Sequence, residues 1–306
     1  KSLVAPERYS VALLKGGYGV KKKGTFAAAS YNVDGLPLLA LNFDGPGSKG
    51  TKTISSRLAG DAWDIIAFQE DFTYDSELRS SMSNYYTFGK YRGGVTSTSS
   101  NDTDGLGFAT LKSTTSFSGE TFIKFNAAYG GLTDGANTCI EKGFRYYLVT
   151  LAGGAQIDVY ITHMNSGSDQ GHKDARASQF QQLAQYIASH NNGNPVVVLG
   201  DFNARYTRDN IQTNFHNNLG DFAEYLSDAW VELVDKYDIN GNLLYAAGVY
   251  PESGSSLVVT EKYEGAEGDI ECTTQGGEVV DKIIYMNNPL SDVLIYADSF
   301  ERDMDY

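Results

Sequence analysis

Acidic, amide and imidazole side chains stand directly after short apolar runs at several distant places in this chain of 306 residues. These residues are Asn32, Glu70, His163, Asp201 and Asn203, and Asp281 opens a further apolar run. In an extended segment, side chains two residues apart point to the same side, so Asp201 and Asn203 are expected to face one site. A strand end is held by its sheet while the next loop is open to solvent, and sites are commonly built there.

The residue types favour phosphate chemistry assisted by a hard cation. Amide and carboxylate oxygens are the ligands that Mg²⁺, Mn²⁺ or Ca²⁺ prefer. Such an ion polarises a phosphoryl oxygen and stabilises the departing oxyanion. His163 can donate to a phosphoryl oxygen or protonate a leaving group. Asp201 can orient a water, and Asn203 can donate to the charge that develops on the phosphoryl oxygens.

Each of these residues also has an ordinary structural interpretation when it is taken alone. Asn32 lies just before Asp34 and Gly35 and could form a turn. Glu70 could be solvated or paired, and His163 could be a half-buried histidine with its hydrogen bonds satisfied. The joint occurrence of these residue types at four strand ends indicates a single cluster. The other histidines, at positions 172, 190 and 216, show no spacing typical of metal ligands and are expected at the surface.

The elements that position these residues are mainly short strands. Strands are predicted at 26–33, 64–70, 106–111, 144–151, 157–163, 195–200, 281–285 and 292–297. Helices are predicted at 51–61, 75–83, 173–190 and 221–236, and the third carries a single apolar stripe. Some strands are apolar throughout, as strands covered on both faces are. We therefore expect an α/β fold in which two sheets pack on each other with helices outside.

Composition narrows the class of protein. The chain has 24 Lys and Arg against 38 Asp and Glu, a net charge of −14. This argues against a protein that binds by wrapping a polyanion. The chain begins at Lys1 without a Met, as an exported protein would after signal removal or as a trimmed chain would. With its 33 Gly, 21 Tyr and many Asn and Ser residues, we expect a secreted, periplasmic or cell-surface location. Cys139 and Cys272 could form one disulfide or remain two free thiols.

The motifs together resemble the endonuclease/exonuclease/phosphatase superfamily, which has a deoxyribonuclease-like fold, and within it the secreted neutral sphingomyelinase-like branch. The matching pieces are SYNV at 30–33, FQE at 68–70, DGLGF at 104–108, KGF at 142–144, THMNSG at 162–167, GDFN at 200–203 and VDKI at 280–283. The resemblance implies a four-layered α/β/β/α sandwich. It also implies that residues 1–306 form a single catalytic domain.

The resemblance assigns roles to individual residues. Asn32 and Glu70 correspond to the divalent-metal ligands, so Mg²⁺, or Mn²⁺ or Ca²⁺, is the expected cofactor. The catalytic residues are then His163 at the phosphate or leaving group, Asp201 at the attacking water, Asn203 at the transition state and Asp281 beside a general-base histidine. Asn165 and Arg205 are expected to contact substrate. Asn165 stands where related secreted enzymes often have Asp, and for Arg205 a structural salt bridge is an equal alternative.

The family's closing Ser-Asp-His segment, which carries the general base, has no counterpart in this sequence. No histidine follows His216. Two explanations are open: the segment and a last strand lie beyond Tyr306, or the protein is a degenerate member. We favour the first, because the other catalytic positions look intact.

The function expected from these observations is metal-dependent hydrolysis of a phospholipid headgroup, as by a sphingomyelinase C. The alternatives are a nuclease, or an inositol-phosphate or sugar-phosphate phosphatase, on the same fold, and a non-catalytic protein that binds phosphorylated ligands. The expected partner is a phospholipid or another phosphodiester substrate. Nucleic acid is disfavoured by the charge, peripheral membrane contact is compatible with a lipid substrate, and we expect a monomer.

Overall fold

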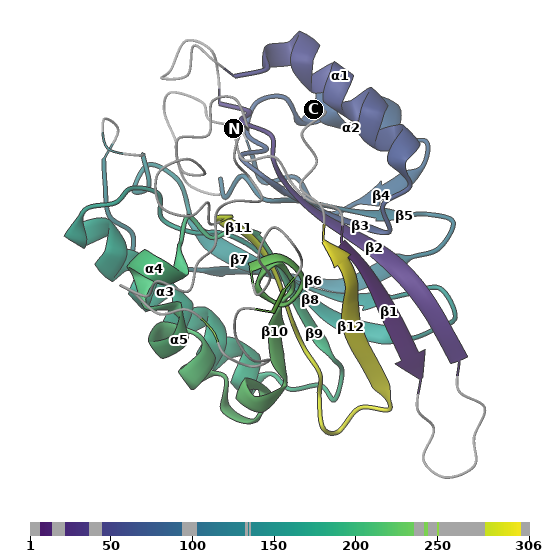
Figure 1. The fold of residues 1–306 in the computed structure, drawn as a ribbon. Helices are drawn as coiled ribbons and strands as arrows, with labels where there is room; N and C mark the ends of the chain where they lie inside the picture. Colours follow the sequence, from purple (N-terminus) through teal and green to yellow (C-terminus); the bar gives the residue numbers. More distant parts are fainter. Residues whose placement is uncertain are drawn as a thin grey trace.

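Two six-stranded sheets lie face to face in the computed structural model, with helices on their outer faces (Figure 1). The structure describes residues 7–13, 22–36, 45–93, 103–131, 134, 136–235, 242–243, 250 and 279–300. Cys272 lies outside these residues, as do residues 301–306. Within the described part, no helix combines the length and the apolar character that crossing a membrane requires.

The first sheet has the strand order β12-β1-β2-β3-β5-β4. Its strands are β1 (Glu7–Leu13), β2 (Lys22–Asn32), β3 (Ile65–Gln69), β4 (Tyr86–Phe88), β5 (Gly107–Leu111) and β12 (Val293–Phe300). The pair β2 and β3 is parallel and the other pairs are antiparallel, so the sheet is mixed.

The second sheet has the strand order β10-β11-β9-β8-β7-β6. Its strands are β6 (Ser116–Lys124), β7 (Gly143–Thr150), β8 (Gln156–His163), β9 (Val196–Asp201), β10 (Leu226–Asp228) and β11 (Asp281–Met286). Here β8 and β9 are the parallel pair. Each sheet therefore contains one parallel pair, whose strands end at the same edge.

Alternation along the central strands separates three layers of buried side chains. On β9, Val197 and Leu199 belong to the cluster between the sheets, whereas Val196 and Val198 belong to the cluster under the helices. Successive residues of a strand face opposite sides, so both sides of β9 are covered and the run is apolar throughout. The same division on β3 places Ile65 between the sheets. The expected four-layered α/β/β/α sandwich is confirmed.

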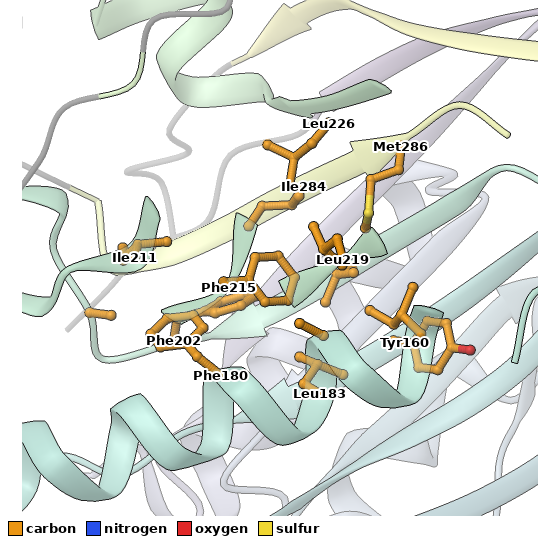
Figure 2. Close-up of a cluster of buried hydrophobic side chains, with 14 of the residues drawn as sticks. Tyr160, Phe180, Leu183, Phe202, Ile211, Phe215, Leu219, Leu226, Ile284 and Met286 are labelled. Carbon is orange, nitrogen blue, oxygen red and sulfur yellow. The ribbon is translucent and has the colours of Figure 1, made fainter. Parts of the chain in front are cut away.

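Helices close the outer faces of the sandwich. The first sheet is covered by α1 (Gly47–Asp61) and α2 (Asp75–Met82), and the second by α3 (Gln170–Ser189), with the short helices α4 (Tyr206–Asp209) and α5 (Ile211–Asn214) beside it (Figure 1). The predicted stripe on α3 is buried, and Figure 2 shows Phe180 and Leu183 of this helix against side chains of the sheet and of the following turns.

The helix predicted at 221–236 is wrong. Residues Gly220–Tyr225 form a 3₁₀-helix, Leu226–Asp228 form β10, and Val231–Asp235 form one π-helical turn. The Asp228 carboxylate accepts hydrogen bonds from the backbone N–H of Trp230 (3.0 Å) and Val231 (3.3 Å). This local bonding by an Asp side chain competes with a continuous helix, and pairing of β10 with β11 supplies an alternative for the backbone.

Four strands were not predicted: β1, β4, β6 and β10. Of these, β6 and β4 are the outermost strands of their sheets, and β10 is an outermost strand of three residues. The β6 segment is largely exposed and polar. Edge strands of this kind lack the apolar periodicity on which the prediction depends. The eight predicted strands are all present, with end points that differ by a few residues.

Candidate active site

The ends of five segments meet at one edge of the sandwich. In the first sheet, Asn32 at the end of β2 is in register with Gln69 at the end of β3, so Glu70 follows directly beside it. In the second sheet, Asp201 at the end of β9 is in register with both His163 on β8 and Asp281 on β11. The parallel pair in each sheet thus delivers its terminal residues to the same edge.

Hydrogen bonds from Asn32 join the two sheets at this edge. Its Nδ2 donates to Glu70 Oε1 at 2.9 Å and to Asp201 Oδ2 at 3.2 Å. Asn32 and Asp201 are 169 residues apart in the chain. The single cluster predicted from sequence is therefore present for these three residues.

Asp201 is the centre of the part of the cluster that comes from the second sheet. Its Oδ2 lies 3.6 Å from Nε2 of His163. Its Oδ1 accepts a hydrogen bond from the backbone N–H of Asn203 at 2.8 Å. The Asn203 side chain donates through Nδ2 to the carbonyl of Met164 at 3.1 Å, so the loops after β8 and β9 are held together. His163 and Asp201 are 5% and 4% exposed.

Three residues at this edge adopt a left-handed backbone, and one of them is Asp34 with φ of 48°. Glu70 has φ of 57° and Asn203 has φ of 49°. Such conformations are uncommon for residues other than Gly, cost of order 1–3 kcal/mol each and cluster at functional sites. Gly35 makes the turn at Glu70 feasible, because a Cβ at position 35 would lie 2.5 Å from the Glu70 carbonyl oxygen. The Gly35 N–H donates to that oxygen at 3.0 Å.

Lys142, a buried lysine to which the sequence assigned no role, lies next to the cluster. Lys142 is 4% exposed, and its Nζ donates to the Met164 carbonyl at 2.9 Å. Burial lowers the pKa of Lys142 to about 8, although the carboxylates of Glu70 and Asp201 act in the opposite direction. The KGF motif at 142–144 marked this position. Sequence could not show that it approaches residues 70 and 201.

The electrostatics of the site favour a cation. Burial raises the pKa of Glu70, and the carboxylates of Asp34 and Asp201 raise it further, whereas the hydrogen bond from Asn32 and the charge of Lys142 lower it. Burial also lowers the pKa of His163 well below its usual value, and the nearby Lys142 adds to this effect. The imidazole is therefore neutral at physiological pH.

The donor set fits a hard divalent ion at Glu70 and Asp201. Both are carboxylates, the oxygen ligands that Mg²⁺ and similar ions prefer, and their burial leaves negative charge that a cation would offset. Asn32 fits this role less directly, because it turns Nδ2 toward the carboxylates. Its Oδ1 accepts a hydrogen bond from Asp34 N–H at 3.0 Å. Ligation by Asn32 would require the amide to rotate and give up that bond.

The remaining predicted residues lie at or beside this edge. Asp281 is 7% exposed and faces Asp201 in the strand register. Asn165 is fully buried: its Oδ1 accepts from Tyr129 N–H at 2.8 Å, and its Nδ2 donates to Ser166 O at 2.9 Å. Arg205 is half-buried and its backbone N–H donates to Asp209. The Asn165 amide thus binds protein groups, and its expected contact with substrate stays a prediction.

Two histidines expected at the surface are buried, contrary to the prediction. His216 is 3% exposed and packs edge-on to Tyr250, and His172 is 1% exposed on the first turn of α3. Only His190 is exposed. Spacing along the chain could not reveal this, because α3 turns position 172 inward against the loop that contains Tyr129.

Among the described residues, one further group of side chains could surround a metal, and it lies around His172. It consists of Asp134, Asp169 and His172. Asn165 Nδ2 donates to His172 Nδ1 at 2.8 Å, which makes Nδ1 an acceptor and leaves the proton on Nε2. That Nε2–H then donates to Asp134 Oδ1 at 2.9 Å. This hydrogen-bond pattern satisfies the imidazole without a metal.

Comparison with known families identifies the class of the protein. The profile of the Endonuclease/Exonuclease/phosphatase family matches residues 29–254, which is most of the chain. The chain therefore belongs to this family, and the expected family membership is confirmed.

Characterised relatives narrow the resemblance. Sphingomyelinases of Mycobacterium bovis and Mycobacterium tuberculosis are 32% identical to the chain over 214 residues, which are 69% of this chain and 39% of theirs. The chain thus spans about two fifths of the length of these relatives.

Solved structures agree with the fold. TDP2 of D. rerio, complexed with a single-strand DNA product, matches with a TM-score of 0.54 at 18% identity and covers 87% of this chain and 85% of that chain. Beta toxin of Staphylococcus aureus matches with a TM-score of 0.50 at 19% identity over 63% of this chain and 70% of that chain. At such identities the likeness establishes the sandwich fold alone.

Proposed function

We propose that the protein is a divalent-metal-dependent phosphodiesterase that hydrolyses a phospholipid headgroup, in the manner of a sphingomyelinase C. The observation that carries this proposal is the hydrogen bonding of Asn32 to both Glu70 and Asp201, which brings carboxylates from two sheets to one point. The family supports hydrolysis of a phosphoric ester. The mycobacterial sphingomyelinases support the lipid substrate.

In this proposal each residue of the cluster has a distinct task. A bound Mg²⁺, Mn²⁺ or Ca²⁺ would be held by Glu70 with Asn32 or Asp201, and it would supply Lewis-acid stabilisation of phosphoryl and leaving-group oxygens. Asp201 orients the water that attacks phosphorus. His163, which is neutral, donates a hydrogen bond to a phosphoryl or leaving-group oxygen.

The donors around these residues complete the arrangement. Asn203 donates to oxygens that gain charge in the transition state. The ammonium of Lys142 offsets the charge of the Glu70 and Asp201 carboxylates. Asp281 would orient a general-base imidazole in line with the resemblance. His163 is the histidine that approaches Asp201, with 3.6 Å between Nε2 and Oδ2.

The test is a comparison of substrates under matched conditions. Wild-type protein is assayed on sphingomyelin vesicles, on single- and double-stranded DNA and on a phosphoinositide, with Mg²⁺ and again with excess EDTA. We expect Mg²⁺-dependent release of phosphocholine and little DNA cleavage, because a net charge of −14 opposes binding of a polyanion. Faster hydrolysis of DNA or of the phosphoinositide would replace the lipid with that substrate.

The non-catalytic alternative is decided by the same assay with one variant. Asp201→Asn keeps the size of the side chain and removes the carboxylate. If vesicles bind wild type and Asp201→Asn equally and neither protein hydrolyses sphingomyelin, DNA or the phosphoinositide under any metal condition, the protein is a binding protein. We further propose that the protein is a monomer that acts outside the cytoplasm and contacts membranes peripherally. Size-exclusion chromatography would check the oligomeric state, and fractionation of the source cells would check the location and the membrane contact.

A further inference from the structure

Arg176 is a buried cation that connects the two loops of the candidate site. It lies on α3, its side chain is fully buried, and it is outside every motif considered above. Nη1 donates to the carbonyls of Asn165 at 2.8 Å and Gly167 at 2.6 Å. These carbonyls belong to the loop that follows His163.

The other nitrogens of Arg176 hold Asp209, the last residue of α4. Nε and Nη2 donate to Asp209 Oδ1 at 2.9 Å and 2.6 Å. The second oxygen, Oδ2, accepts from the backbone N–H of Arg205 at 2.9 Å and from Arg208 Nε at 2.7 Å. One buried carboxylate therefore fixes the segment from position 205 to position 209.

Arg208 connects Asp209 to Asn203 by hydrogen bonds to both residues. Arg208 Nη2 donates to the backbone carbonyl of Asn203. Asn203 holds a left-handed backbone and donates to Met164 O, so its position depends on both loops. The chain of contacts from Arg176 through Asp209 and Arg208 thus ends at a residue of the candidate site.

The shape of the arginine side chain matters for this connection. A guanidinium presents five N–H donors in a rigid plane, whereas an ammonium is a point charge with fewer fixed directions. Arg176 uses three nitrogens for three separate acceptor groups on two loops. A lysine at this position could keep the charge, but it could not hold both loops at once.

We propose that Arg176 and Asp209 are positioning residues for the hydrolytic site: their ion pair sets the distance between the loop after His163 and the loop that carries Asn203. The inference rests on the proposed function for its kinetic consequence. Its geometric consequence, coupled order of the two loops, is independent of the substrate. A buried ion pair often adds little net stability, because removing both charges from water offsets their attraction. A role in positioning the two loops therefore explains the Arg176–Asp209 pair better than a role in stability.

The kinetic test uses Arg176→Lys and Asp209→Asn in the intact protein. We expect kcat on sphingomyelin to fall by a factor of about 10², since a displacement of about 1 Å at reacting groups costs that much. KM should change only a few-fold. The kcat of the double variant should be no lower than that of the less active single variant, because both substitutions remove the same connection. Arg208→Gln is a milder variant in case the buried changes prevent folding, and it should lower kcat in the same direction.

Leu183→Ala is the matched control. Leu183 is fully buried on the same helix and packs in the cluster under the second sheet. Its truncation should lower Tm, whereas kcat below the transition should stay within about twofold of wild type, because the cost of a core cavity falls on stability. A purely structural role for Arg176 would make its variants behave like Leu183→Ala, and that result would overturn the proposal.

Hydrogen exchange separates this inference from the proposed function. In Arg176→Lys, the amides of Asn165, Asn203 and Arg205, whose acceptors are Gln179 Oε1, Asp201 Oδ1 and Asp209 Oδ2, should exchange faster. Amides of β7 should keep wild-type protection. If wild type hydrolyses no phosphodiester but the two loops still lose protection together, the positioning claim holds and the function fails. Unchanged exchange in both loops would refute the positioning claim whatever the activity.

Discussion

At the scale of single residues, the site depends on a balance of charge around Glu70. Its half-buried carboxylate accepts a hydrogen bond from Asn32 and lies in the fields of Asp201 and Lys142. Asp201 and Lys142 are buried beside it, and burial lowers the pKa of Lys142 to about 8. The arrangement therefore binds a proton or a metal more readily than an exposed carboxylate would.

Glu70→Gln should separate activity from stability. We expect turnover to fall by a factor of about 10² or more, from loss of Lewis-acid stabilisation worth several kcal/mol. In EDTA at neutral pH, the variant should melt no lower than wild type, because it removes a buried charge. Because the pKa of Glu70 is raised in the folded state, the folded state binds more protons than the unfolded state between pH 4.5 and that raised pKa. Wild-type stability without metal should therefore decline as pH rises through that window, and the variant should lack this decline.

Differential scanning fluorimetry checks the Glu70 prediction. Millimolar Mg²⁺ should raise the Tm of wild type by mass action and leave that of Glu70→Gln unchanged. Equal Mg²⁺ shifts in both proteins would show that Glu70 is not a ligand.

Lys142 should set the alkaline limit of activity. Its pKa is about 8, so the ammonium is lost as pH rises through that value and no longer offsets Glu70 and Asp201. We expect kcat to fall above about pH 8, and Lys142→Arg to move this limit upward. The stability effect has the opposite sign: between pH 8 and 10.5 the unfolded state binds more protons, so stability gains from this residue as pH rises. Lys124→Met, which removes an exposed lysine from β6, should leave the pH profile of kcat unchanged.

At the scale of elements, the site is made by how parallel strands end. The β8–β9 pair ends at His163 and Asp201, and Gly200 allows the two backbones to approach just before that point. A Cβ at position 200 would lie 2.0 Å from the carbonyl oxygen of Thr162. The Gly in the GDFN motif is thus explained by strand pairing, and the polar residues around it by the edge where that pairing ends.

Gly200→Ala should disturb both stability and activity. Crowding in a packed interior typically costs 1–3 kcal/mol, and here the displaced backbone carries Asp201. We expect a lower midpoint in urea unfolding and a kcat reduced at least tenfold in the fraction that stays folded. Gly24→Ala on β2 is the control, because nothing lies within 4 Å of a Cβ there. A Gly200→Ala protein with wild-type kcat would show that the β8–β9 spacing does not govern the site.

Sequence predicted most strands inside the sheets and missed three of the outermost ones, although it also missed the internal strand β1 and found the outermost strand β12. Strands such as β3 and β9 are apolar on both faces because two layers cover them, and such runs stand out. The edge strand β6 is polar and exposed, so it carries no such pattern. The false helix at 221–236 arose because apolar content was visible, whereas the Asp228 turn and the pairing of β10 were not.

At the scale of the whole molecule, the sandwich brings distant chain segments to one edge, where the described residues of the proposed site lie together. The motif residues in the candidate site were predicted because strand ends repeat one pattern. Lys142 and Arg176 were missed because their contacts join residues that are far apart in the chain. Lys142 and Met164 are 22 residues apart, and Arg176 and Asp209 are 33 residues apart. The KGF motif marked the position of Lys142 without giving it a role, and nothing in the segment around Arg176 distinguishes it from an ordinary helix arginine.

A core substitution far from the site should affect stability alone. Ile157 is fully buried between the sheets near the start of β8, six residues before His163, or about 20 Å along the strand. Ile157→Ala should cost about 2–5 kcal/mol of unfolding free energy, as measured by chemical denaturation. kcat measured well below the transition should match wild type. A selective loss of kcat in this variant would indicate that the opposite edge contributes to catalysis.

The most direct measurement is a crystal structure of the protein soaked in Mn²⁺, with anomalous scattering used to locate the ion. The account predicts a strong peak within coordination distance of a Glu70 carboxylate oxygen, at the edge where Asn32 and Asp201 meet. A peak only at the Asp134, Asp169 and His172 group, with Glu70 directed away from any ion, would contradict it.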